Sequence, residues 1–214
     1  MRAGRAHSST YNSRIYWKGM ERFVLVARPH GNIRQQLWKL KREAFDWNRD
    51  DASMAMPEGF ICGWFDASKF STGLSKSAFS EHVQRTLTRY ADEICAVLPD
   101  TFRFSSAIEA RDRIMLKLDD ELDIPKLKVT LERFAQDAGL EPCADALTPD
   151  NEAYRGIWLG SGTISSAPFP LSFKKYELVL YLAELPETPF SGFQFRTVAR
   201  IHRKTKAHPR TERE

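Results

Sequence analysis

The stretch GFICG at residues 59–63 and the stretch GIWLG at residues 156–160 share one form, an apolar core bounded by glycines. Short apolar runs of this kind, set between turn residues, are typical of buried β-strands. Each stretch follows an earlier apolar run at a similar distance, since 37 residues separate Arg22 from Gly59 and 43 separate Arg113 from Gly156. The matching positions predict an internal duplication, in which the order strand, helix, loop and strand occurs twice.

Apolar periodicity and capping residues predict the elements around these two strands. In chain order they are a strand at 23–27, a helix from Asn32 to Phe45, a helix from Phe79 to Val97, a strand at 101–107, a strand at 113–118, a helix from Asp123 to Ala138, and strands at 171–182 and 193–201. The predicted fold is α+β, with two pseudo-repeated strand–helix–strand lobes whose antiparallel sheets lie around a central cleft.

Composition excludes several classes of protein. The chain has 214 residues, of which 42% are hydrophobic, and no stretch approaches the roughly 20 apolar residues that a membrane-spanning helix needs. Its three cysteines, Cys62, Cys95 and Cys143, are odd in number and widely spaced, which fits neither a disulfide framework nor a zinc module. We therefore expect a cytoplasmic protein in a reducing compartment, with no membrane contact.

The charge is distributed unevenly. Residues 1–20 carry four basic and no acidic side chains, and residues 200–214 carry six basic and two acidic ones, so the remainder is net acidic. We interpret residues 1–20 as a disordered extension, with Met1 and Met20 both open as the natural start, and residues 204–214 as a basic C-terminal tail. Residues 21–203 form a single bilobal domain, with halves at about 21–110 and 111–203. Basic tails either contact nucleic acid or are solvated surface.

This layout resembles the two-histidine (2H) phosphoesterase superfamily, which includes the LigT-like RNA ligases and cyclic phosphodiesterases. Three segments carry the resemblance over residues 21–203: the opening RFVLVARP at 22–29 with its helix, ICGWFD at 61–66 with the long helix after it, and the closing pair 171–185 and 193–201. In that family the second strand of each half carries a His-x-Thr/Ser motif. The two imidazoles act as general base and general acid at phosphorus, and the two hydroxyls bind the phosphate.

Both motifs are missing from this sequence. The preferred alignment places Gly59 and Ile61 at the first His and Thr/Ser positions, and Gly156 and Trp158 at the second. None of these side chains can transfer a proton, and no histidine lies in either strand. The resemblance therefore implies a degenerate member with no catalytic residues of the family type.

Seven residues are candidate ligand contacts. They are Trp64, Arg155, Trp158, Ser161, Thr163, His30 and His202. The tryptophans offer rings for base stacking, although packing in the core is the alternative. The turn GSGT at 160–163 offers backbone N–H groups to a phosphate but lacks the lysine and the spacing of a P-loop.

The two candidate histidines have different settings. His30 precedes a predicted helix N-terminus, where an anion could bind, and His202 leads the last strand into the basic tail. Solvent-exposed histidines without a ligand are the alternative at both positions. No two histidines are spaced along the chain like metal ligands, so the sequence predicts neither a metal nor a cofactor.

Three functions remain open at this point. The preferred one is a 2H-like domain that has lost catalysis and binds a nucleotide, an RNA end or a protein partner through its cleft and basic tails. The first alternative is an active RNA or cyclic-nucleotide phosphodiesterase that uses displaced residues such as His30 or His202. The second is a structural subunit that docks on a larger assembly through its basic tails.

Overall fold

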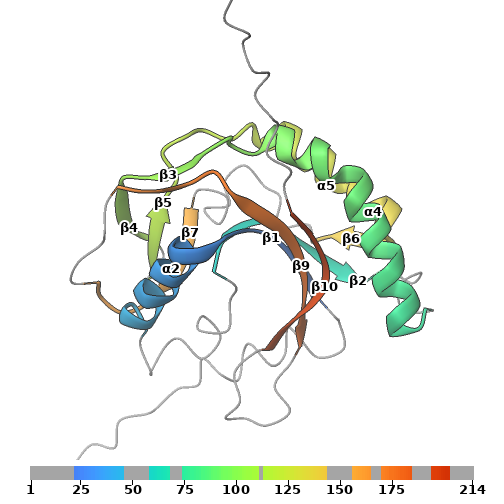
Figure 1. Ribbon diagram of the computed structural model, residues 1–214, viewed down its shortest axis with the longest axis horizontal. Helices are drawn as coiled ribbons and strands as arrows, with labels where there is room; N and C mark the ends of the chain where they lie inside the picture. The colour runs from blue at the N-terminus through green and yellow to red at the C-terminus, as the bar shows by residue number, and fades with distance from the viewer. Residues whose placement is uncertain are drawn as a thin grey trace, which may run out of the picture.

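The computed structural model describes residues 22–45, 58–67, 74–110, 113–143, 156–164, 170–184 and 194–202. Within these residues the fold is α+β, as expected, with helices packed on mostly antiparallel sheets (Figure 1). The elements are β1 (Arg22–Pro29), α2 (Gly31–Glu43), β2 (Phe60–Ala67), α4 (Lys76–Val97), β3 (Phe102–Phe104), β4 (Ser106–Ala110), β5 (Arg113–Lys117), α5 (Ile124–Ala138), β6 (Leu140–Pro142), β7 (Gly156–Gly160), β8 (Leu171–Phe173), β9 (Tyr176–Glu184) and β10 (Gln194–His202). The predicted extension at 1–20 and the tail at 204–214 lie outside the described residues.

The largest sheet has five strands in the order β10-β9-β1-β2-β6. Its central strand, β1, pairs antiparallel with β9 on one side and with β2 on the other. The side chains of residues 23–27 are all buried, because both faces of this strand are covered. A strand covered on both faces has a continuous apolar run rather than an alternating one, which explains the sequence FVLVA.

Helices α4 and α5 cover one face of this sheet (Figure 1). The apolar stripe predicted for the longer helix is confirmed, since Phe79, Val83, Leu87, Tyr90 and Ile94 are buried along α4. Ser75 caps α4 by accepting a hydrogen bond from the backbone N–H of Ala78 at 3.2 Å. The main hydrophobic core thus lies between this helical layer and the sheet.

The predicted caps of α5 are also confirmed. The Asp123 side chain accepts a hydrogen bond from the backbone N–H of Lys126 at 3.0 Å. Gly139 ends the helix with φ +70°, in the left-handed region that favours glycine. The apolar residues of α5 therefore face the core in the register that the sequence predicts.

Two smaller sheets complete the fold. One has the order β4-β5-β7 and the other consists of β3 and β8, all antiparallel. Helix α2 contacts β7 and β8, so it lies apart from the α4 and α5 layer (Figure 1). Its predicted apolar face is confirmed by the buried Leu37, Leu40 and Ala44.

The structure corrects four sequence-based boundaries. The strand expected at 101–107 is two strands, β3 and β4, which pair with different partners. The strand expected at 171–182 is also two, β8 and β9, because Lys174 and Lys175 interrupt it where the chain passes between sheets. Residues 140–142, where no strand was predicted, pair with β2 as β6. The cap of α2 is His30 rather than Asn32, and the helix begins at Gly31 with φ +58°.

Among the described residues, no helix combines the length and the apolar character that crossing a bilayer requires. None of the three cysteines, all of them among the described residues, forms a disulfide bond, and Cys62 is completely buried in β2. Burial raises the pKa of the Cys62 thiol, so this group is protonated and unreactive, as its apolar neighbours predict.

Two positions require glycine for steric reasons: Gly59, directly before β2, and Gly156, the first residue of β7. A Cβ atom at Gly59 would lie 2.6 Å from the carbonyl oxygen of Ala27 in β1. A Cβ atom at Gly156 would overlap the carbonyl oxygen of Leu116 in β5. In both places the obstacle is the backbone of the neighbouring strand, which cannot rotate away.

This contact predicts the effect of adding one methyl group. Gly156→Ala should lower the free energy of unfolding by about 1–3 kcal/mol, because overpacking displaces backbone. Gly63→Ala is the matched control in β2 and should cost less, since the Cβ would meet side-chain ends, Leu131 Cδ1 at 3.0 Å and Phe65 Cζ at 3.2 Å. Urea unfolding measures both, and equal losses would contradict the steric explanation.

A buried lysine in α2 predicts a pH dependence of stability. Lys41 is only 3% exposed, and burial lowers its pKa from 10.5 to about 8. Between these two values the unfolded chain binds the extra proton, so the free energy of unfolding should rise with pH, by about 3 kcal/mol in all. Lys41→Met should remove this rise. Urea unfolding from pH 7.5 to 10.5 measures the difference between the variants, and parallel curves would contradict the prediction.

Candidate functional site

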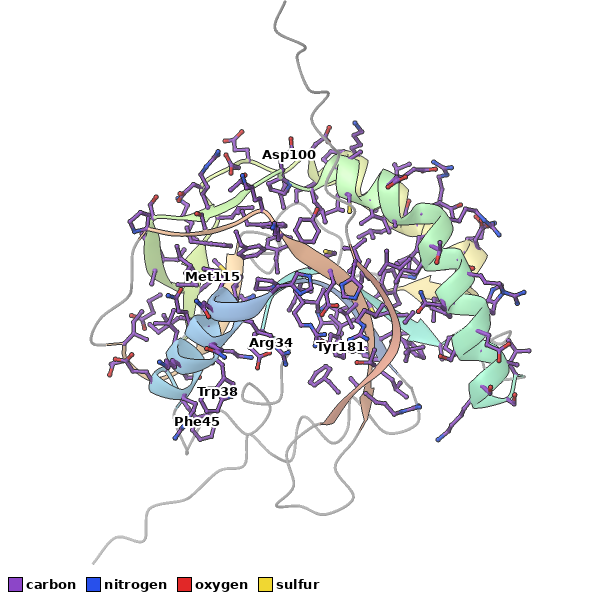
Figure 2. All side chains as sticks on the ribbon, in the orientation of Figure 1. Arg34, Trp38, Phe45, Asp100, Met115 and Tyr181 are labelled. Carbon is purple, nitrogen blue, oxygen red and sulfur yellow. The ribbon has the colours of Figure 1, made fainter. Side chains whose placement is uncertain are left out.

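The five-stranded sheet has a second face, opposite α4 and α5. Side chains alternate along a strand, so those of Phe23, Leu25 and Ala27 join the main core and those of Val24 and Val26 point the other way. This second face consists of the buried Val24, Val26, Ile61, Val179 and Tyr181, with the partly buried Trp64, Trp158 and Phe195 packed against them. Figure 2 shows Tyr181 on this side of the sheet, away from α4 and α5.

Strand register places three polar residues side by side at one end of the second face. Arg28 of β1 is paired with Glu177 of β9, and Glu177 is paired with His202 of β10. The next row that points to the same side contains Arg200, Val179 and Val26. A polar row therefore borders the apolar part of the second face.

Glu177 is a buried carboxylate, 3% exposed, that is held by an arginine. Arg28 Nε donates a hydrogen bond to Glu177 Oε1 at 2.6 Å, and Arg28 Nη2 also contacts Oε1. Arg28 Nη1 donates to the Tyr181 hydroxyl at 2.7 Å. Burial raises the pKa of Tyr181, and the nearby Arg28 charge opposes that rise. Both charges are buried away from water, and each one compensates the other.

The second oxygen of this carboxylate is in a different situation. Glu177 Oε2 is buried and accepts no hydrogen bond from the described residues. His202 Nδ1 lies 3.4 Å from it, and Arg200 Nε lies 3.7 Å from it. Both side chains are more than half exposed, so Oε2 lies just beneath the surface and faces the two of them.

His30 joins this group from the turn between β1 and α2. Its ring stacks against the ring of His202, with 5.5 Å between centroids and 27° between planes. His30 is the N-cap residue of α2, but its side chain makes no capping hydrogen bond. One donor atom from each of His30, Glu177 and His202 lies within 4.8 Å of the other two. We call these three residues the His–Glu–His cluster.

Helix α4 holds the strand that carries His202 in place. β10 is an edge strand, and Gln84 of α4 pairs with both backbone groups of Arg200: its amide donates to the carbonyl at 3.1 Å and accepts from the N–H at 2.9 Å. Ser80 donates to the carbonyl of Val198 at 2.7 Å. These side chains form hydrogen bonds that a neighbouring strand would otherwise form, and they hold the backbone of β10 in place beside the cluster.

The four residues at the predicted motif positions have two kinds of surroundings. Ile61 belongs to the second face and Trp158 packs against it, whereas Gly59 and Gly156 abut neighbouring backbone. Trp64, expected as a stacking surface, also packs against the second face and is partly buried. These positions offer apolar surface and no acid or base.

The glycine-rich turn after β7 is already engaged. The backbone N–H of Gly162 donates to the carbonyl of Ala44, at the C-terminal end of α2, at 2.7 Å. The two hydroxyl residues of the turn are Ser161, which is half-buried, and Thr163, which is exposed. The other candidate, Arg155, lies outside the described residues. The turn thus ties β7 to α2, and the Gly162 amide is not available to a phosphate.

Sequence reasoning named His30 and His202 but missed their proximity and missed Glu177 altogether. The two histidines are 172 residues apart, and only the pairing of β9 with both β1 and β10 brings them together. The available signal was a glutamate in an otherwise apolar strand, Glu177 in YELVLYLAE. A charged residue within a buried strand needs a partner.

Comparison of the chain with models of known protein families, with curated proteins and with solved structures finds no significant match. The functional argument therefore depends on the geometry of the second face and of the His–Glu–His cluster.

The buried ion pair predicts a strong coupling between two substitutions. Arg28→Met or Glu177→Leu alone should cost about 3–5 kcal/mol, because each leaves one buried charge uncompensated. The double variant should cost clearly less than the sum. Arg103→Met is a control, since its partner Asp120 is exposed, and such pairs contribute at most about 1 kcal/mol. Additive losses in urea unfolding would contradict the coupling.

Proposed function

We propose that this chain is a 2H phosphoesterase-like domain that has lost the family's catalysis and binds the phosphate-bearing end of a nucleotide or an RNA. One observation carries the proposal. His30, His202 and Arg200 gather around the buried Glu177 at the end of a face on which Trp64 and Trp158 are partly exposed. Cations and hydrogen-bond donors beside aromatic rings are what a phosphate attached to a base requires.

The charge balance of the site favours an anion. Arg28 offsets the charge of Glu177, so Arg200 is the excess cation at this end of the second face. The Arg200 side chain is 53% exposed and is therefore accessible to a ligand. The two exposed imidazoles add N–H donors at the same place.

Strand pairing supports the proposed relation between the two halves. β2 pairs antiparallel with β1 and β7 pairs antiparallel with β5, and each pair has one register shift. Gly59 and Gly156 each abut a carbonyl group of the opening strand of their half. These parallels support a duplication with halves at 21–110 and 111–203. The five-stranded sheet contains strands from both halves: β1 and β2 come from the first half, and β6, β9 and β10 come from the second.

The location of the motif positions supports the same relation. Ile61 comes from the first half and Trp158 from the second, and both contribute to the second face. In the family, the corresponding hydroxyl residues act on one phosphate. Their counterparts in this chain are apolar, which supports a site that retains the position of the ligand without the original chemistry.

The proximity of His30 and His202 favours a second candidate, an active phosphodiesterase. Acid–base transfer at phosphorus needs one neutral and one protonated imidazole close together. The ring centroids are 5.5 Å apart, and Glu177 Oε2 lies 3.4 Å from His202 Nδ1. In this candidate His30 is the general base and His202 the general acid.

Ligand binding and turnover can be measured on the same samples. Nucleoside monophosphates, 2′,3′-cyclic phosphates and short RNAs are added to the full chain, and the melting temperature and the products are recorded. A bound ligand at 100 times its Kd should stabilise the native state by about 2.7 kcal/mol. A shift without product supports the binding domain, and product formation that His30→Ala abolishes supports the phosphodiesterase. The absence of any shift and of any product would contradict both.

A pair of arginine variants tests the place of binding. Arg200→Ala should weaken binding of the best ligand at least 10-fold, because it removes the excess cation of the site. Arg133→Ala is the matched control, since Arg133 of α5 is 56% exposed and also ion-paired, to Glu93 at 3.0 Å. Titration calorimetry gives both affinities. Equal affinity of the two variants would place the ligand elsewhere.

A further inference from the structure

A second property of the His–Glu–His cluster does not depend on the proposed function. The cluster offers two imidazoles and one carboxylate, and a donor atom from each lies within 4.8 Å of the others. Two histidines with one carboxylate are a common set of protein ligands for Zn²⁺ and related ions. We infer that His30, Glu177 and His202 form a binding site for one divalent transition-metal ion, of which Zn²⁺ is the best fit.

The environment of the Glu177 carboxylate favours a bound ion. Glu177 is 3% exposed, and among the described residues its Oε2 accepts no hydrogen bond. A buried, charged oxygen that loses water without gaining a hydrogen bond is costly. The imidazole and guanidinium nitrogens that form ion pairs with it, at 3.4 and 3.7 Å, are too distant for a hydrogen bond. A cation bound at Oε2 would be a closer partner than either of them.

The distances between the ligand atoms also fit a bound ion. Zn²⁺ binds nitrogen and oxygen ligands at about 2.0–2.2 Å, so two ligands of a tetrahedral site lie about 3.4 Å apart. His202 Nδ1 and Glu177 Oε2 already have this separation, 3.4 Å. The limit of 4.8 Å on the third ligand requires His30 to approach by at most about 1.4 Å. His30 is exposed and makes no capping hydrogen bond, so its side chain is free to turn toward the ion.

The orientation of the Glu177 carboxylate also fits a bound ion. Arg28 contacts Oε1 with two of its nitrogens and leaves Oε2 for another ligand. Hydrogen bonds of this kind to the remote oxygen fix the direction of a metal-binding carboxylate. Arg28 is in turn held by the Tyr181 hydroxyl, so the carboxylate is oriented before an ion arrives.

The charges around the cluster limit the affinity and define the coordination. Arg28 is paired with Glu177, and Arg200 must move from its position 3.7 Å from Oε2 when an ion binds there. Arg200 is exposed and can move, and the bound ion then replaces its charge beside Oε2. Three protein ligands leave one position of a tetrahedral ion for water or for an oxygen of a ligand. The cluster thus has the composition of an open site.

Metal binding is tested on the full chain with Zn²⁺ alone, in the absence of any nucleotide. Titration calorimetry should show one ion per chain. Co²⁺ in place of Zn²⁺ should give visible absorption bands of a four-coordinate ion. Mg²⁺ should bind at least 10-fold more weakly, because it prefers oxygen ligands. Mg²⁺ binding as tight as Zn²⁺ binding would overturn the assignment of the ligands.

Histidine variants identify the ligands. His30→Ala and His202→Ala should each weaken Zn²⁺ binding at least 10-fold, and both residues are exposed, so the metal-free melting temperature should change little. His82→Ala is the matched control, because His82 lies on α4 with its Nε2 2.9 Å from the carbonyl oxygen of Asp137. The inference would be overturned if all three variants bound Zn²⁺ equally. It would also be overturned if neither the variants nor the unsubstituted chain bound Zn²⁺.

Binding of Zn²⁺ and binding of a phosphate ligand are separate results. Loss of Zn²⁺ binding in the His30→Ala and His202→Ala variants supports the metal site even when no nucleotide shifts the melting temperature. A nucleotide-dependent shift in a chain that binds no Zn²⁺ would overturn the metal site and leave the proposed function standing.

Discussion

The ion pair between Arg28 and Glu177 links the fold to the candidate site. It joins β1 and β9, two neighbouring strands in the interior of the five-stranded sheet, on the side opposite α4 and α5. A slip of one residue between these strands would turn Arg28 or Glu177 toward the main core, where neither charge has a partner. The apolar alternation and the buried ion pair therefore specify the same register, and that register determines which side chains meet at the end of the second face.

The site follows from the geometry around this pair. β1 ends at Pro29, one residue after Arg28, and His30 follows directly, with its ring stacked on that of His202. β10 brings His202 to the other side of Glu177, and Gln84 holds its backbone. The outcome is two exposed imidazoles above one buried carboxylate oxygen. We propose that a phosphate or a metal ion binds here, because strand pairing and the Arg28 ion pair hold the polar groups in place.

Local patterns predicted the elements better than their arrangement. The stripes and caps of α4 and α5 were readable because helix periodicity and capping depend on neighbours three or four residues apart. The break at Lys174, the pairing of β6 with β2, and the use of the Gly162 amide by α2 depend on partners far away in the chain. The pairing of His30 with His202 is of the same kind. Sequence identified these two residues singly, and strand order made them a site.

The central claim is that function is concentrated at His30 and His202. The most direct measurement is nuclear magnetic resonance of the imidazole signals of all five histidines during titration with a nucleoside 2′,3′-cyclic monophosphate. The account predicts that the signals of His30 and His202 shift together, with one saturation curve, while that of His82 does not move. Shifts confined to His7 and His208, or shifts of His82 in place of the pair, would contradict it.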